Sequence, residues 1–403
     1  MNSEKIINIL IIHNTINSQF ENLALFLARN PFLRVYYLTR EKTEHSFHRL
    51  HVRHYDYSEK NNYLPLEKET QEGLAVIESL KKLRNEEGFV PDIVIGTAGW
   101  GALLFIKDLY PDVRLVGYFE WFYHASGSDV AFWPDEIPTE ERRKILRLRN
   151  AYLLVQLDAC DVGYTPMNWQ KAQFPKEYRD SIHVIHEGVD TGYYAPAPGT
   201  KMVLPGLDLS DAKEVVTYVT RGMEPYRGFP NFMEAVKILQ KHRPECEIVI
   251  AGNDRTIYGR KPGNGKTWKE IELEKGGLDL SRIHFTGWLS RNNYRRLLQA
   301  STVHVYLTRP FVLSWSMVQS MSAGCCLVSS RTPPVEEVVT DHENGLLADF
   351  RSPQEIAGCI EEALDDEELR RRLSEAARNT IMQKYSLQLC LQKQMDMIFG
   401  KND

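Results

Sequence analysis

Short runs of aliphatic and β-branched residues alternate with longer amphipathic stretches along almost the whole chain. In the first half, the runs that read as buried strands are Ile6–Ile12, Arg34–Thr39, Asp92–Ile95, Arg114–Tyr118, Asp161–Thr165 and His183–His186. The stretches between them with apolar residues at helical spacing include Gln19–Ala28, Thr70–Leu83 and Glu140–Leu157. Continuous apolar strands that alternate with helices are typical of a parallel sheet covered on both faces. The pattern therefore predicts an α/β fold.

Prolines and glycines interrupt this alternation at Ala195–Gly199 and again at Pro205–Gly206. A second series then begins, with expected strands at Val215–Thr220, Glu247–Ala251, Ile283–Thr286, Val303–Leu307 and Cys326–Ser329, and expected helices at Asn231–Lys241, Asn292–Ala300 and Trp315–Ala323. Segments rich in proline and glycine often separate domains. We therefore expect an N-terminal domain over 1–200, a C-terminal domain over 201–385, and a last helix over 386–403 that packs back toward the first domain.

Length and composition narrow the class of protein. The 403 residues suit two domains of about 200 residues each. The net charge of −5 gives no reason to expect nucleic acid as a partner. The six cysteines include no Cys-x-x-Cys pair, and no apolar run approaches the roughly 18 residues of a membrane-spanning helix. These features favour a cytoplasmic protein with reduced thiols.

Four histidines recur at every third position: His45, His48, His51 and His54. The segment reads as a strand, in which side chains at odd spacing alternate between faces, so one metal ion could not collect all four. We therefore expect no metal site.

Two arginines flank a tight loop after the first strand of the second domain. Arg221 and Arg227 lie in the segment Val219–Phe229, which contains glycine and proline and precedes an expected helix. A guanidinium group binds two phosphate oxygens at once and keeps its charge at any physiological pH. The segment therefore predicts a phosphate-binding loop, with surface salt bridges as the alternative explanation of both arginines.

A similar arrangement follows the strand that ends at Leu307. Pro310 turns the chain, Ser314 can cap the next helix and Gly324 can end it. The start of such a helix offers unpaired N–H groups to an anion. Any α/β unit needs these features, so this spacing does not by itself identify a function.

These two segments together resemble glycosyltransferase family 4, whose members have the two-domain GT-B fold. Further segments that carry the resemblance are Arg331–Val338, Glu343–Leu347, His13–Thr15, Gly117–Tyr123 and Val184–Asp190. The resemblance keeps its order over essentially the whole chain, and the PFVLSWS segment Pro310–Ser316 is similar to a bacterial-type subgroup. It implies two facing Rossmann-like domains with parallel sheets and C-terminal helices, with the donor bound mainly by the C-terminal domain.

The resemblance implies a donor diphosphate site at Arg221, Arg227 and Ser314. In that family an Arg and a Lys bind the pyrophosphate, and here both positions are Arg, so the charge is retained. Two glutamates separated by seven residues normally follow. Their positions are here occupied by Phe311 and Gln319, so both acids are missing.

This departure changes what is expected of donor recognition. Gln319 can still accept one hydrogen bond from the ribose hydroxyls, without a charge. A phenylalanine ring forms no hydrogen bond with the sugar, so the resemblance implies that other groups read it, such as the backbone around Val312 and Leu313.

The remaining site residues also follow from the resemblance. The segment Ile283–Leu289 is similar to the one that reads the nucleobase, which places Trp288 and Leu289 beside the base, although Trp288 could equally pack in the core. In the N-terminal domain, Glu120 and His124 occupy the region of a family histidine near the reacting sugar. Glu120 could instead be paired with an arginine. His13 is expected to face the cleft, with a loop histidine satisfied by its neighbours as the alternative.

The function implied is that of a retaining hexosyltransferase. It would move a sugar from a nucleotide-sugar donor to a saccharide or lipid-linked glycan acceptor in surface polysaccharide biosynthesis. The leaving diphosphate would take the acceptor's proton, so catalysis would rest on positioning and electrostatics. The chain contains no Asp-x-Asp motif, which favours metal-independent turnover without a cofactor other than the donor. A non-catalytic sugar-nucleotide-binding homologue and a GT-B sugar-nucleotide epimerase are the alternatives.

A basic stretch within the expected helix Glu140–Leu157 bears on location. Its five cations are Arg142, Arg143, Lys144, Arg147 and Arg149. Related enzymes that act on lipid-linked acceptors touch anionic lipid through such helices, so peripheral contact with the inner membrane face is one reading. A solvated helix face is the other.

Overall fold

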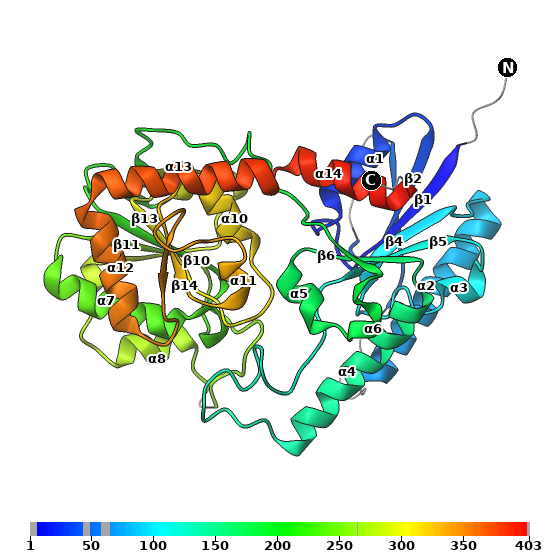
Figure 1. Ribbon diagram of the computed structural model, residues 1–403, viewed down its shortest axis with the longest axis horizontal. Helices are drawn as coiled ribbons and strands as arrows, with labels where there is room; N and C mark the ends of the chain where they lie inside the picture. The colour runs from blue at the N-terminus through cyan, green and yellow to red at the C-terminus, as the bar shows by residue number, and fades with distance from the viewer. Residues whose placement is uncertain (1–5, 43–48, 58–64, 264, 401–403) are drawn as a thin grey trace. The chain divides into compact units, whose positions relative to one another are not determined.

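The computed structural model describes residues 6–42, 49–57, 65–263 and 265–400. The chain divides into two compact units (Figure 1): unit 1 comprises residues 1–187 and 391–403, and unit 2 comprises residues 188–390. The boundary expected near residue 200 therefore lies 13 residues later than the observed one, since residues 188–200 belong to unit 2. The end of the chain is grouped with unit 1 from Leu391 onward.

Unit 1 is built on a seven-stranded parallel sheet with the order β3-β2-β1-β4-β5-β6-β7. Its strands are β1 (Ile7–Ile12), β2 (Leu33–Thr39), β3 (Leu50–His54), β4 (Ile93–Ala98), β5 (Arg114–Phe119), β6 (Val162–Thr165) and β7 (Ile182–Val184). Its helices are α1 (Glu21–Ala28), α2 (Pro65–Glu87), α3 (Ile106–Leu109), α4 (Glu140–Ala159), α5 (Asn168–Gln173), α6 (Lys176–Arg179) and the greater part of α14 (Leu387–Phe399).

The core of unit 1 follows from the alternation of side chains along its strands. Leu10 and Ile12 of β1 point to the same face as Leu38 of β2, where they meet buried apolar residues of α2, α3 and α4. The strands are apolar on both faces because helices cover a doubly wound sheet. Thr139 caps α4 by accepting a hydrogen bond from the Arg142 N–H (3.2 Å).

Unit 2 repeats the plan with a six-stranded parallel sheet of order β12-β11-β10-β13-β14-β15. Its strands are β10 (Val215–Gly222), β11 (Glu247–Asn253), β12 (Ile283–Gly287), β13 (Val303–Tyr306), β14 (Leu327–Ser330) and β15 (Leu346–Ala348), beside an antiparallel hairpin of β8 (Met202–Leu204) and β9 (Leu207–Leu209). Its helices are α7 (Phe229–His242), α8 (Trp268–Glu274), α9 (Arg291–Ala300), α10 (Trp315–Ser322), α11 (Pro333–Glu336), α12 (Pro353–Asp365) and α13 (Glu367–Lys384), with 3-10 turns η1 (Pro225–Arg227) and η2 (Leu280–Arg282).

The alternating α/β pattern of the sequence is confirmed. Every expected strand is present, with ends that differ by at most three residues. The pattern missed β15 and the β8–β9 hairpin, whose strands have three residues each, although β7, of the same length, was expected at His183–His186. The hairpin lies within the segment that was interpreted as the proline- and glycine-rich domain boundary.

Candidate active site

Two neighbouring strands of unit 2 end where the chain makes tight turns. After β10 the chain forms η1 and enters α7 through Gly228, whose φ of +70° is left-handed. A side chain at this position would meet the Leu307 side chain, because an added Cβ would lie 2.7 Å from the Leu307 Cβ atom. This close approach brings the loop after β10 against the loop after β13, at the sheet edge where α/β proteins bind ligands.

Arg227 lies at the centre of this junction and is buried, with 7% of its surface exposed. Its Nη1 atom donates to Thr308 Oγ1 (2.7 Å) and lies 3.1 Å from both Tyr306 Oη and Val312 O. These partners are all neutral, and within the described ranges Arg227 forms no ion pair. A buried guanidinium that keeps its positive charge without a carboxylate is suited to bind an anion.

Arg221 lies near the end of β10 and is exposed. It forms no ion pair with any residue that the structure describes. The interpretation as a surface salt bridge is therefore wrong for the buried Arg227, and the described residues offer no such partner to Arg221.

Ser314 begins α10 and is linked to Arg227 through one phenol. The Ser314 Oγ atom accepts from the Ser316 N–H (3.3 Å), which confirms the expected helix cap. The Ser314 N–H donates to Tyr306 Oη (2.8 Å), the same oxygen that Arg227 approaches. The N-terminus of α10, with its positive dipole end, therefore lies beside the buried arginine.

The residues proposed to read the ribose and the sugar already have partners within the protein. The Gln319 Oε1 atom accepts from Tyr294 Oη (3.0 Å) of α9. Val312 offers its carbonyl oxygen to Arg227, and the Leu313 side chain is buried. Gln319 keeps its amide hydrogens as the groups most readily available to a ligand.

Trp288 and Leu289 follow β12 directly. Trp288 is 66% exposed, so its interpretation as core packing is wrong. Leu289 is half-buried.

Glu224 was not recognised from the sequence, although it precedes Arg227 by only three residues. The side chain is fully buried, and its carboxylate accepts backbone N–H groups of Ile257 (3.1 Å), Tyr258 (3.1 Å) and Gly259 (2.8 Å). This fastens the loop after β11 to the loop after β10. It also places the Tyr258 ring 5.2 Å from the Arg227 guanidinium carbon.

Phe311, noted from the sequence only as a lost acid, belongs to a cluster of three rings. It packs edge-on against Tyr226 (5.7 Å between centroids) and Tyr258 (5.4 Å). We call Tyr226, Tyr258 and Phe311 the aromatic cluster. Its members come from the loops after β10, β11 and β13, so it holds these three loops together around Arg227.

In unit 1, Glu120 and His124 lie in the long loop between β5 and α4. The carbonyl oxygen of Glu120 accepts from Gln170 Nε2 (2.7 Å), and the side chain is half-buried. The Nε2 atom of His124 lies 2.8 Å from Gln173 O. Because a carbonyl oxygen only accepts, Nε2 carries a proton.

His13 follows β1 and is buried, with 5% of its surface exposed. Its Nδ1 atom lies 3.0 Å from Thr15 O and 3.2 Å from Thr15 N, whereas Nε2 has no hydrogen-bond partner among the described residues. Burial lowers the pKa of His13 to about 4, so the ring is neutral near pH 7. The alternative of a loop histidine satisfied by its neighbours therefore holds for one ring nitrogen only.

The remaining residues singled out from the sequence are the four histidines and the cations of α4. His45 and His48 lie outside the described residues, while His51 of β3 stacks on Tyr36 with 4.7 Å between centroids. Across the described ranges, no group of three or more His, Cys, Asp or Glu is arranged to hold a metal ion. On α4, Arg142, Arg143, Lys144 and Arg147 are exposed and Arg149 lies over the Tyr123 ring.

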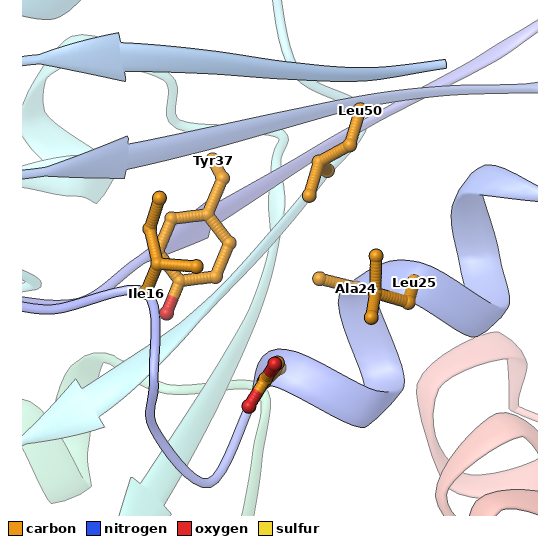
Figure 2. A pocket seen from close by; sticks show the side chains of 6 residues that line it. Ile16, Ala24, Leu25, Tyr37 and Leu50 are labelled. Carbon is orange, nitrogen blue, oxygen red and sulfur yellow. The ribbon is translucent and has the colours of Figure 1, made fainter. Parts of the chain in front are cut away.

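Figure 2 shows a hollow of unit 1 between α1 and the strands β2 and β3. It is lined by Ile16, Glu21, Ala24, Leu25, Tyr37 and Leu50. The lining is mostly apolar and contains no cation, and the Tyr37 hydroxyl donates to Thr15 O (2.9 Å). This hollow therefore lacks the chemistry of a phosphate site. In the described part of the chain, no helix is long and apolar enough to cross a membrane.

Two family models match the chain in succession. Residues 34–194 match the model described as "Glycosyl transferase family 4 group", and residues 206–380 match "Glycosyl transferases group 1". The matched residues are thus a glycosyltransferase family 4 N-terminal domain followed by a group 1 domain, and the α/β fold is of the GT-B type.

Individual relatives support the same class. The chain is 28% identical over 179 residues to alpha-D-kanosaminyltransferase of Streptomyces kanamyceticus, a match that covers 44% of this chain and 43% of the relative. It is 28% identical over 227 residues to the lipopolysaccharide core biosynthesis glycosyltransferase LpsE of Rhizobium meliloti, covering 56% and 59%. The chain thus spans about half the length of the curated relatives it matches.

A solved structure covers nearly the whole chain. HepE of Anabaena, crystallised with UDP and glucose, superposes with a TM-score of 0.71 at 15% identity, over 98% of this chain and 100% of that one. At this identity the likeness establishes the fold.

Proposed function

We propose that the protein is a retaining glycosyltransferase that uses a nucleotide-sugar donor, whose diphosphate is bound by unit 2. The observation that carries this proposal is the buried cation of Arg227, which forms no ion pair in the described chain and lies beside the N-terminus of α10. Arg221 and Ser314 complete the diphosphate site, Gln319 contacts the ribose, and Trp288 and Leu289 flank the base. That HepE binds UDP, UDP-glucose and glucose supports a donor of this class.

The chemistry follows from where negative charge develops. When the bond between the anomeric carbon and the diphosphate breaks, charge accumulates on the leaving oxygen. Arg227 and the positive dipole end of α10 would stabilise that charge without reorganising, because hydrogen bonds to Tyr306 and Thr308 already hold Arg227 and the start of α10 in place. The leaving diphosphate would take the proton of the acceptor hydroxyl. Turnover would then need no metal ion, no further cofactor and no protein nucleophile.

Residues of unit 1 would handle the acceptor. Glu120 and His124 would orient its hydroxyl or stabilise positive charge on the transferred hexose, and His13 would line the acceptor region. The acceptor is a saccharide or a lipid-linked glycan in surface polysaccharide assembly, which the name of the LpsE relative supports. The exposed cations of α4 would allow peripheral contact with anionic lipid at the cytoplasmic face of the membrane.

Calorimetry with UDP-, GDP-, ADP- and dTDP-sugars tests the donor site. One of these donors should bind wild type, and Arg227→Ala should weaken its binding about 100-fold, since a buried charge-assisted contact to phosphate is lost. The matched control is Arg371→Ala, whose guanidinium is 67% exposed on α13 and should not affect affinity. Binding that survives Arg227→Ala unchanged would refute the site.

A non-catalytic nucleotide-sugar binder is the second candidate, favoured by one contact. The Gln319 oxygen, which would have to accept from the ribose, is already occupied by Tyr294. Release of free nucleotide that depends on an added saccharide acceptor would support the transferase. Tight donor binding without release under any acceptor condition would support the binder.

A further inference from the structure

Two arginines of α9 share one aromatic partner. Arg291 and Arg295 lie one helical turn apart, and their guanidinium carbons are 4.5 and 4.4 Å from the centroid of the Tyr193 ring. Arg291 also forms a side-chain hydrogen bond with Tyr194. Arg291 is exposed, whereas Arg295 and Tyr193 are half-buried. Like charges at positions i and i+4 destabilise a helix, so an anion that compensates this pair is expected.

The described part of the chain supplies no such anion. Neither arginine of this pair forms an ion pair with a residue that the structure describes. Other arginines of unit 2 are compensated, since Arg243 pairs with Glu214 and Arg331 pairs with Asp341. The chain also contains more acidic than basic residues, 54 against 49, so carboxylates are not scarce. The two positive charges at Tyr193 are therefore left without an ion-pair partner among the described residues.

The turn that carries Tyr193 is held in place by hydrogen bonds. The Asp190 Oδ1 atom accepts from the Tyr193 N–H (2.9 Å), and the Tyr193 hydroxyl donates to Asn292 Oδ1 (2.8 Å). Arg378 of α13 donates to Tyr194 O (3.3 Å). The carboxylate of Asp190 is thus engaged with the backbone of its own turn. Because the ring is fixed, the guanidinium groups stacked on it are oriented before a ligand binds.

The chemistry of this pair selects the kind of anion. Stacked guanidinium groups leave the N–H groups along their edges available to a ligand. Two such edges suit a phosphate monoester, which carries about 1.5 to 2 negative charges near pH 7 and has three accepting oxygens. A carboxylate carries one charge, which a single bidentate arginine already satisfies. Segments that bind anionic membranes usually contain about four to eight cations, more than this pair offers. A soluble phosphate compound is therefore the ligand class that fits.

We propose that Arg291, Arg295 and Tyr193 form a binding site for the phosphate group of a soluble phosphomonoester or polyphosphate. Its residues differ from those of the proposed donor site, so this assignment does not rest on the transferase function. Arg291 follows Trp288 by three residues, so the site comes directly after the segment proposed to flank the base. A phosphate group bound there would also reduce the repulsion between the two arginines and so stabilise unit 2.

Calorimetry on the full chain tests the site. The probes are ribose 5-phosphate and inorganic tripolyphosphate, with succinate and citrate as their carboxylate counterparts. Wild type and Arg227→Ala are both titrated, so that binding at the proposed donor diphosphate site is recognised by its loss in the second protein. Each phosphate should bind more tightly than its carboxylate counterpart, and the double variant Arg291→Gln/Arg295→Gln should raise the Kd of tripolyphosphate about tenfold.

The matched control is Arg296→Gln. Arg296 is an exposed arginine of the same helix, but its Nη1 atom contacts Val203 O (3.4 Å). Salt screens a charge that does not touch the ligand, so the Kd of tripolyphosphate should change by about twofold or less in this variant.

A second set of variants separates a ligand site from a purely structural stack of side chains. Tyr193→Phe keeps the ring and should bind tripolyphosphate like wild type. Tyr193→Ala should raise the Kd about fivefold, because the guanidinium groups lose their orientation. Tripolyphosphate should also raise the melting temperature of wild type by more than that of the double-arginine variant.

Several results would overturn the proposal. These are an equal loss of affinity in Arg296→Gln, tighter binding of the carboxylates, and binding that Arg227→Ala abolishes completely. The same holds if folded wild type binds neither phosphate probe, or if it binds only vesicles that contain phosphatidic acid.

Discussion

The carboxyl edges of the two sheets differ in the partners of their buried polar groups. In unit 2, two of the buried charges are engaged within the protein: Arg227 has three neutral acceptors, and Glu224 accepts three backbone N–H groups. In unit 1, buried atoms of His13, Glu69 and Gln170 have no hydrogen-bond partner among the described residues. The first edge is preorganised around one fixed group, which suits a diphosphate. The second keeps unused hydrogen-bonding capacity, which suits a polyhydroxylated ligand.

The largest effect on stability is expected from a steric clash at the edge of the unit 1 sheet. Gly101→Ala should destabilise unit 1 by about 3 kcal/mol or more, for two reasons. The new Cβ would clash with the Glu69 backbone, and the positive φ of this residue is unfavourable for alanine. The matched control is Gly127→Ala, with φ of +80° but no atom within 4 Å of the added Cβ. Gly127→Ala should lower the free energy of unfolding by only about 1 kcal/mol. Urea unfolding measures both, and equal losses would show that the contact with α2 is unimportant.

The next prediction isolates the charge of Glu69 through pH. Burial raises the pKa of Glu69 from its ordinary value of 4.5 to about 8, so the folded state holds a proton that the unfolded state has lost. Wild type should therefore lose stability as pH rises toward 8, by about 1.4 kcal/mol per unit at most.

Glu69→Gln removes this dependence. Between pH 6.5 and 8, the variant should gain about 2 kcal/mol relative to wild type. The neutral ring of His13, whose pKa is about 4, does not titrate in the folded state over that window. Unfolding curves for the control Glu78→Gln, whose carboxylate is 72% exposed on α2 and pairs with Lys81, should stay parallel to those of wild type. A Glu69→Gln curve parallel to wild type as well would mean that Glu69 is ionised in the folded protein.

A smaller effect is expected at Glu224 of unit 2, whose carboxylate holds the loop after β11 against the loop after β10. Glu224→Gln replaces one carboxylate oxygen by an NH₂ group, which cannot accept hydrogen bonds from the backbone N–H groups of the loop after β11. The free energy of unfolding should therefore fall by about 1 to 2 kcal/mol. The loop that carries Tyr258 beside Arg227 would loosen, and donor affinity should fall about tenfold. Glu343→Gln, at an exposed position of the same unit, serves as the control. Unchanged donor affinity would show that Glu224 does not support donor binding.

The smallest effect is expected at Trp288. Because its side chain is 66% exposed, Trp288→Ala should change stability by no more than about 0.5 kcal/mol. Loss of stacking on the base should lower UDP affinity about fivefold. Unchanged UDP affinity would remove Trp288 from the base site, and a large loss of stability would indicate packing that the exposure does not reveal.

The sequence predicted those features of the fold that depend on long, regular patterns. The long strands and helices α1, α2, α4, α7, α9 and α10 were recognised, since buried parallel strands have continuous apolar character and helices repeat over several turns. Shorter helices such as α3, α5 and α8 were not. The hairpin over 202–209 and β15, with three residues in each strand, were not recognised, although β7 of the same length was. The observed unit boundary after Glu187 falls within Val184–Asp190, a segment that carries the family resemblance, where composition gives no signal.

The site was predictable only in part, because its contacts join distant segments. Arg227 was recognised from its place after a strand, but its partners Tyr306 and Thr308 lie about 80 residues away. Glu224 and Glu69 each look like ordinary surface acids in the sequence. Their importance depends on burial and on the loops packed against them, which one-dimensional periodicity does not report. The spacing of Glu69, Glu72 and Val76 on one helical face was a signal that could have been noticed.

The central claim is that unit 2 carries metal-independent glycosyl transfer through Arg227. The most direct measurement is the acceptor-dependent release of nucleotide from the donor found by calorimetry, in the presence of EDTA. Wild type and Arg371→Ala should release nucleotide at the same rate with and without EDTA. Arg227→Ala should release it about 100-fold more slowly. Complete loss of release in EDTA, or a wild-type rate in Arg227→Ala, would contradict the account.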